Sequence, residues 1–164
     1  MNKLIALLSL FLACVGTMKA QTAQQPYFQL PIIPDSIKSF DNRLDYMVEH
    51  YWDFADMKKV FSSRPKMAEA FDTYINFMPH ATATKAKASV SKFLKSIKKP
   101  EDLLFIAELA EGKLYADTAL LPSDELYVLF AQAVADNRGV NRNAKMRFEH
   151  QARTLSRTQR GMKA

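Results

Sequence analysis

The stretch from His50 to Asp56, which reads His50-Tyr51-Trp52-Asp53-Phe54-Ala55-Asp56, holds the residue types best suited to chemistry. It contains the single tryptophan of the chain, one of its three histidines and two carboxylates. His50 and Asp53 are three residues apart, so on a continuous helix their side chains would share one face. An imidazole beside a carboxylate could bind a metal ion or exchange a proton with a substrate.

The rest of the chain does not supply the partners that such a site needs. His80 and His150 have no matching ligand residues near them in sequence, and no HExxH pair occurs. In the alternative interpretation the segment ends a helix, its aromatic rings pack into the core, and Asp53 or Asp56 caps the next turn. We favour this packing role, and we predict no metal ion, no cofactor and no catalytic residue in the chain.

Nucleophilic catalysis has no better support in the sequence. The chain lacks a GxSxG elbow, and its only cysteine, Cys14, lies in the apolar N-terminal segment. Serines and threonines have no histidine at a spacing typical of a catalytic pair. A pair of carboxylates brought together by the fold stays open, because sequence alone cannot pair them across helices.

The N-terminal 20 residues are typical of a secretory signal peptide. A positive start is followed by the apolar run Leu4–Val15, which is shorter than the roughly 20 residues that span a bilayer. We predict cleavage after Ala20, and lipidation of Cys14 is the alternative. We therefore expect a periplasmic or secreted protein, which contacts a membrane only if Cys14 is lipidated.

Beyond that segment, apolar residues recur with a helical period from residue 38 to residue 160. Capping residues, prolines near helix starts and apolar stripes predict six helices. Their expected ranges are residues 41–51, 63–78, 82–98, 100–112, 123–134 and 143–159. We expect Asp41 to cap the first helix and Gly112 to end the fourth.

These features predict a single all-α domain, built as a bundle of helical hairpins. No stretch alternates as a strand would, and after the signal segment only Gly112, Gly139 and Gly161 remain as glycines. So few glycines argue against glycine-rich nucleotide loops and against β folds with tight turns.

Short segments flank the predicted helical domain on both sides. Residues 21–37 are polar and then proline-spaced, which predicts an extended N-terminal arm. We expect Ile32 and Ile33 of this arm to lie against the body. Residues 161–164 are predicted to be a short linker.

Basic residues gather in two places. Residues 80–99 hold six lysines and no acid, and residues 138–164 hold eight basic residues against Glu149 alone. Arg153, Arg157 and Arg160 are spaced to form one ridge on the last helix, which is our candidate partner surface. Aromatic residues do not interleave with these cations, so we expect no nucleic-acid partner. We favour solvated faces, or ridges covered by acidic groups of a neighbouring module, over an anion-binding surface.

Four segments resemble a helical domain of unknown function in secreted proteins of Gram-negative bacteria. They are His50-Tyr51-Trp52-Asp53, Leu120-Leu121-Pro122-Ser123-Asp124-Glu125-Leu126-Tyr127, the helix after it, and Gln159-Arg160-Gly161-Met162-Lys163-Ala164. The resemblance covers residues 28–164. In many members of that family a thioredoxin-like module follows the helical domain, so the resemblance implies that residues 161–164 approach such a module.

Two functional classes follow from these observations, and a third has weaker support. The first is an exported helical accessory domain that binds a protein, such as a thioredoxin-like module in the same or another chain. The second is the N-terminal part of a periplasmic thiol-disulfide oxidoreductase, whose Cys-x-x-Cys this chain lacks. The third is a metal-assisted enzyme built around His50 and Asp53.

Overall fold

The computed structural model describes residues 28–161, and side chains of residues 28–157. The predicted signal peptide, Cys14 and Ala20 lie outside the described residues. Within that range the chain forms seven α-helices and one 3-10 turn, with no strand. The predicted all-α fold is therefore confirmed.

Six of the α-helices correspond to the predicted ones. In chain order the elements are α1 (Phe40–His50), α2 (Met57–Phe61), α3 (Arg64–Phe77), η1 (Met78–His80), α4 (Ala83–Ser96), α5 (Pro100–Leu114), α6 (Asp124–Asp136) and α7 (Arg142–Gly161). The five-residue helix α2 was not predicted. Asp56 caps it by accepting a hydrogen bond from the Lys59 backbone N–H at 3.2 Å, as the packing interpretation of that segment expected.

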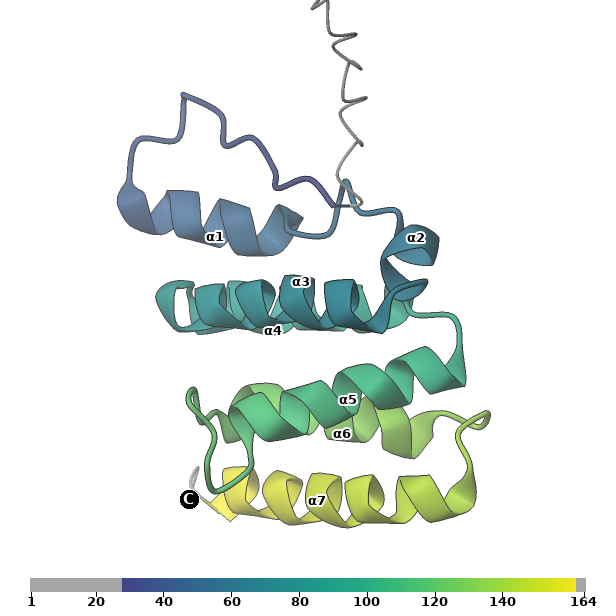
Figure 1. The fold of residues 1–164 in the computed structure, drawn as a ribbon. Coiled ribbons are helices and arrows are strands. Elements are labelled where there is room, and N and C mark those ends of the chain that lie inside the picture. The colour runs from purple at the N-terminus through teal and green to yellow at the C-terminus, as the bar shows by residue number, and fades with distance from the viewer. Residues whose placement is uncertain (1–27, 162–164) are drawn as a thin grey trace, which may run out of the picture.

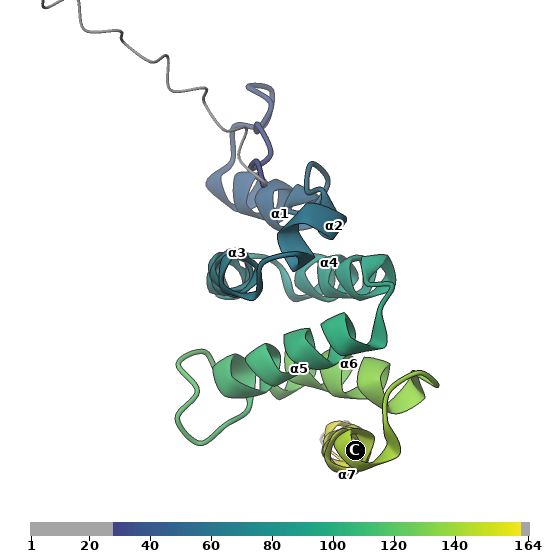
Figure 2. The same ribbon diagram turned by 45° about the vertical axis from the view of Figure 1, so that its right-hand side comes forward.

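The helices stack in layers, as Figure 1 shows. The N-terminal arm and α1 form one end, α3 and α4 form the next layer, α5 and α6 form the third, and α7 forms the opposite end. The view in Figure 2 shows the same order of layers. Helices α5 and α6 pack against each other, α6 packs along α7, and α1 packs on α4.

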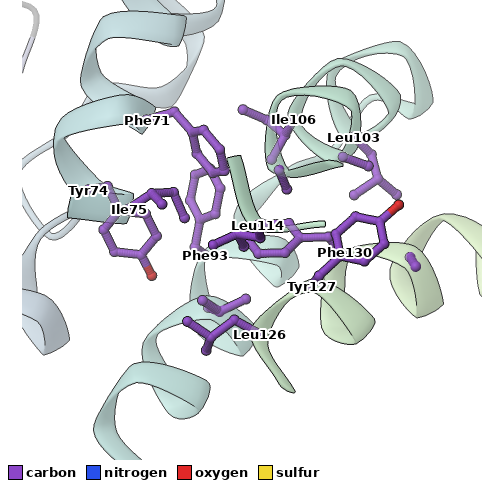
Figure 3. Packing of buried hydrophobic residues seen from close by; sticks show 14 of the residues in the cluster. Phe71, Tyr74, Ile75, Phe93, Leu103, Ile106, Leu114, Leu126, Tyr127 and Phe130 are labelled. Atoms are coloured by element: carbon purple, nitrogen blue, oxygen red, sulfur yellow. The ribbon is translucent and has the colours of Figure 1, made fainter. Parts of the chain in front are cut away.

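One continuous apolar core joins these layers. Its buried side chains run from Val48 in α1 to Leu155 in α7, and Phe28 of the arm packs against it. Phe71 and Phe93 stack across α3 and α4, and Phe71 meets Phe130 of α6 edge-on at 5.7 Å (Figure 3). The aromatic rings thereby tie the second layer to the third.

Two predicted helix boundaries are wrong. Ser39, not Asp41, is the N-cap of α1, and Asp41 lies in its first turn. Helix α5 passes through Gly112 and ends at Leu114, whose side chain is buried. Gly112 does not end the helix because its position faces open space, and one further half-turn places Leu114 in the core.

The flanking segments also differ in detail from expectation. Ile32 is 80% exposed and points away from the body, whereas Pro31 is buried and Phe28 packs on the core. The expectation is therefore wrong for Ile32, while Ile33 is half-buried, and Phe28 and Pro31 hold the arm to the body. Helix α7 includes Gly161, the first residue of the predicted linker, and residues 162–164 lie outside the described range.

Candidate functional site

His50 and Asp53 do come together, where α1 ends. His50 Nδ1 lies 2.7 Å from Asp53 Oδ2, and Lys92 Nζ of α4 donates to Asp53 Oδ1 at 2.5 Å. Partial burial would raise the pKa of Asp53, but hydrogen bonds from Lys92 and His50 outweigh it and hold that pKa below its ordinary value. Asp53 is thus ionised at neutral pH, and it is unsuited to act as a general acid.

The surroundings of this pair do not resemble a metal site. Across the described residues, no three His, Cys, Asp or Glu side chains converge closely enough to hold a metal ion. Both carboxylate oxygens of Asp53 already accept hydrogen bonds, one from His50 and one from Lys92. The arrangement is that of an ion-paired helix end.

Asp53 is one of three acidic residues that join α1 to α4. Asp45 accepts hydrogen bonds from the Thr82 backbone N–H at 2.7 Å and from its hydroxyl at 3.1 Å, so it completes the N-terminal cap of α4. Glu49 accepts from Lys85 at 2.7 Å, and this hydrogen bond raises the pKa of Lys85. Asp45, Glu49 and Asp53 are spaced by four residues, so they form one acidic row that faces α4. We call this row and its partners the α1–α4 seam.

The seam accounts for much of the lysine-rich segment. Lys85 pairs with Glu49 of α1, Lys92 pairs with Asp53 in the turn after α1, and Lys87 pairs with Glu125 of α6 at 2.5 Å. These three lysines therefore pair with acidic groups of the same domain, whereas the expectation was a solvated face or a cover of acidic groups from a neighbouring module. The acidic spacing along residues 45–53 was the sequence signal that could have indicated the seam.

Two of the three aromatic residues of the His50–Asp56 stretch, Tyr51 and Trp52, pack as the alternative interpretation held, whereas Phe54 is 64% exposed. Trp52 stacks on Phe93, with ring centroids 4.5 Å apart and planes at 15°. Tyr51 is fully buried and donates its hydroxyl hydrogen bond to the Ala70 carbonyl at 2.8 Å. Tyr74 and Ser89 share a buried hydrogen bond of 2.8 Å nearby. This end of α1 therefore joins the core of the second layer.

A second polar cluster lies between α5, α6 and α7. Arg147 contacts Glu108 at 3.0 Å and Glu111 at 3.3 Å. Gln151 donates to Glu111 at 2.6 Å and accepts from the Tyr127 hydroxyl at 2.6 Å. The two carboxylates therefore share a guanidinium, and the cluster fixes the orientation of α7.

The predicted arginine ridge is only partly described. Arg153 and Arg157 are exposed on α7, on the side opposite to Phe148, Ala152 and Leu155 of the core. The side chain of Arg160 lies outside the described residues. Arg153 and Arg157 are spaced by four residues, so they share this outer face of α7, and Glu149 lies one turn before Arg153.

An apolar groove of about 460 Å³ opens between the second and third layers. Its walls come from η1, the first turns of α4, the end of α5, the α5–α6 loop and the start of α6. Ile75, Leu114 and Leu126 line it, and Figure 3 shows these three side chains coming from three different helices. Lys87 and Glu125 also line the groove, and they pair with each other, so the opposite charges at its rim are matched.

The α5–α6 loop holds one wall of this groove in place. The Leu121 backbone N–H donates to the Lys113 carbonyl, and the Ser123 N–H donates to the Leu114 carbonyl at 2.9 Å. Ser123 also caps α6. Leu120 is thereby presented at the groove with 81% of its surface exposed. This stretch carries part of the family resemblance, but its local pattern does not indicate that the loop borders a groove.

A sequence model of the domain of unknown function DUF5106 matches residues 13–158. The chain belongs to the DUF5106 family. This agrees with the resemblance to a helical domain of unknown function. None of the curated proteins compared with the chain matches it significantly.

A crystal structure of a thioredoxin-like protein from Bacteroides caccae has a similar fold, with a TM-score of 0.68 and 22% sequence identity. The match covers 77% of this DUF5106 chain and 47% of that protein, so the chain spans less than half of its length. A likeness at this identity shows the shared fold. None of the helices in residues 28–161 is long and apolar enough to cross a membrane.

Proposed function

We propose that this DUF5106 domain is a non-catalytic protein-binding domain, and that the apolar groove receives its partner. The groove is the observation that carries the proposal. Its volume of about 460 Å³ is sufficient for one or two large apolar side chains, and its rim charges are already paired. His50 and Asp53, the residues best suited to catalysis or metal binding, serve instead to join α1 to α4.

We propose further that the partner is a thioredoxin-like module, in the same polypeptide or in another, outside the cytoplasm. The shared fold covers 47% of a thioredoxin-like protein, so more than half of that protein lies beyond the helical part. The N-terminal apolar run supports export. The alternative, that the chain is the N-terminal part of a thiol-disulfide oxidoreductase, makes the same contact intramolecular.

The test is photo-crosslinking in the native cell. A benzophenone amino acid is placed at Leu120, beside the groove, and at Met146, an exposed apolar position on α7. We expect an adduct from position 120 whose cross-linked peptide belongs to a thioredoxin-like sequence, and none from position 146. An absent adduct, or equal adducts at both positions, would contradict the proposal.

A matched pair of substitutions on α4 separates the groove from the rest of the surface. Ala83 and Ala88 are both exposed on the same helix, but only Ala83 lines the groove. We expect Ala83→Trp to fill the groove and lower the adduct yield at least tenfold, while Ala88→Trp leaves it unchanged. Circular dichroism should show equal helicity in both variants.

The arginine ridge on α7 is the second candidate face, because Arg153 and Arg157 are exposed and positively charged. If the groove is the binding face, replacing both residues with serine leaves the adduct at position 120 unchanged. Loss of the adduct in that variant, with Ala83→Trp unaffected, would move the binding face to α7.

A further inference from the structure

The large apolar side chains that stay exposed are not spread evenly over the described residues. Four of six belong to the arm, to α1 and to the turn after it, and they are Leu30, Ile32, Phe40 and Phe54. The arm and α1 form one end of the stack in Figure 1. Exposed apolar side chains that gather in one region mark contact with a protein or a membrane.

The arm is fixed in the orientation that exposes these side chains. Phe28 packs its ring 4.7 Å from Tyr51, and Pro31 is buried. Because side chains alternate along an extended chain, burial of Pro31 turns Leu30 and Ile32 outward.

The far end of the arm is fixed as well. A turn closes with the Ile37 N–H donating to the Pro34 carbonyl at 3.0 Å. Arg43 then donates to the Ile37 carbonyl at 3.1 Å, which ties this turn to α1. Phe40 follows this turn as the first residue of α1, and it is 73% exposed.

We propose that this end of the molecule, through Leu30, Ile32 and Phe40, rests on the surface of a lipid bilayer. The proposal takes the processing alternative in which Cys14 is lipidated, because that leaves a membrane-attached residue ahead of Phe28. Fully extended, the residues between Cys14 and Phe28 span at most about 50 Å, so an attachment there keeps this end near the bilayer. Apolar side chains that insert beside such an attachment add a second contact with the bilayer.

The charges around the three side chains indicate what kind of bilayer contact this is. Lys38 is exposed among the acidic residues Asp35 and Asp41, so the surface has no basic excess. Attraction to anionic headgroups is therefore weak, and the contact depends on apolar insertion. It requires no anionic lipid, and high salt does not abolish it.

The experiment uses residues 21–164, which contain the whole core and no cysteine. An N-terminal histidine tag holds the protein on phosphatidylcholine vesicles that contain a nickel-chelating lipid, and so imitates an N-terminal attachment. An environment-sensitive NBD label is placed at Ile32→Cys or, as the control, at Leu120→Cys. The two positions are matched, with 80% and 81% of their surface exposed.

We expect the emission of the label at position 32 to rise at least twofold and to shift to shorter wavelength on vesicles, also in 1 M NaCl. The label at position 120 should change little, and Leu30→Gln with Phe40→Gln should reduce the rise at position 32. Unchanged emission at position 32, or equal changes at both positions, would overturn the proposal. So would a change at position 32 that appears without vesicles as protein concentration rises, because the occupant would then be a second copy.

Discussion

Asp53 accepts hydrogen bonds from side chains of two different segments, His50 at the end of α1 and Lys92 on α4. Both donors favour the ionised carboxylate, so its pKa is lower in the folded protein than in the unfolded chain. A group with a lowered folded-state pKa stabilises the fold above its unfolded pKa, near 4. Its contribution disappears as pH falls through the folded-state pKa.

Asp53→Asn should therefore lower the free energy of unfolding by about 1 kcal/mol at pH 7, since the ion pairs are partly exposed. The difference between wild type and variant should shrink as pH falls below about 4. Urea unfolding between pH 2.5 and pH 7 measures both effects. Asp35→Asn, an exposed carboxylate on the arm, is the control and should change little. A constant difference across this pH range would argue against the ion-pair explanation.

At the scale of elements, the turn between α6 and α7 passes close to the start of α5. Gly139 lies in this turn, and a Cβ atom added there would come 2.5 Å from Cγ of Pro100 and 3.3 Å from the side-chain oxygen of Asn137. Gly139 donates its backbone N–H to that same oxygen at 2.8 Å. The turn is therefore close-packed against the first residue of α5.

Gly139→Ala should lower the free energy of unfolding by about 1–3 kcal/mol, because the proline ring must move to admit the methyl group. Gly112→Ala on α5 is the matched control. It faces open space within a helix, so it should stabilise the protein by about 0.5–1 kcal/mol. Thermal and urea unfolding of the two variants should thus move in opposite directions. If both variants were destabilised equally, the close packing of the turn against Pro100 would not explain the effect of Gly139→Ala.

The elements themselves were mostly predictable from local signals. Ser123 and the prolines at Pro65 and Pro100 mark helix starts in the sequence and in the structure. Helix α2 escaped prediction because five residues are too few to show a helical period. The end of α5 was predicted wrongly at Gly112, because a solvent-facing glycine can lie within a helix as well as at its end.

The contacts between elements were much less predictable. The α1–α4 seam joins residues 36 to 39 positions apart, such as Glu49 with Lys85 and Asp53 with Lys92. The sequence shows an acidic row and a lysine-rich segment, but only the layered packing brings them together. The groove beside Leu120 combines side chains of five elements and the α5–α6 loop in the same way, so local pattern could not reveal it.

At the scale of the whole molecule, three buried tyrosines link stability to alkaline pH. Tyr51, Tyr74 and Tyr127 lie in different layers, all three are fully buried, and burial raises the pKa of each phenol. Above pH 10 the unfolded chain loses these protons while the folded protein retains them. The unfolded state is thereby favoured.

The free energy of unfolding should consequently fall above pH 10, by about 1.4 kcal/mol per pH unit for each tyrosine. Urea unfolding from pH 9 to pH 11 measures the slope. Tyr127→Phe should reduce the slope by one tyrosine's share, in addition to the loss of its hydrogen bond to Gln151. A slope that does not change in this variant would indicate that other groups control the alkaline transition.

The layered order of the helices has a mechanical consequence. The described chain begins on the arm over α1 and ends in α7, at the opposite end of the stack (Figure 1). The two ends are therefore separated along the direction in which the layers stack. A pulling force applied to the two ends would separate the interfaces between layers one after another, and would not shear all of them at once. Because α1 and α7 each have a neighbouring layer on one side only, these outer helices would detach first. The aromatic contact between the α3–α4 layer and the α5–α6 layer would separate last.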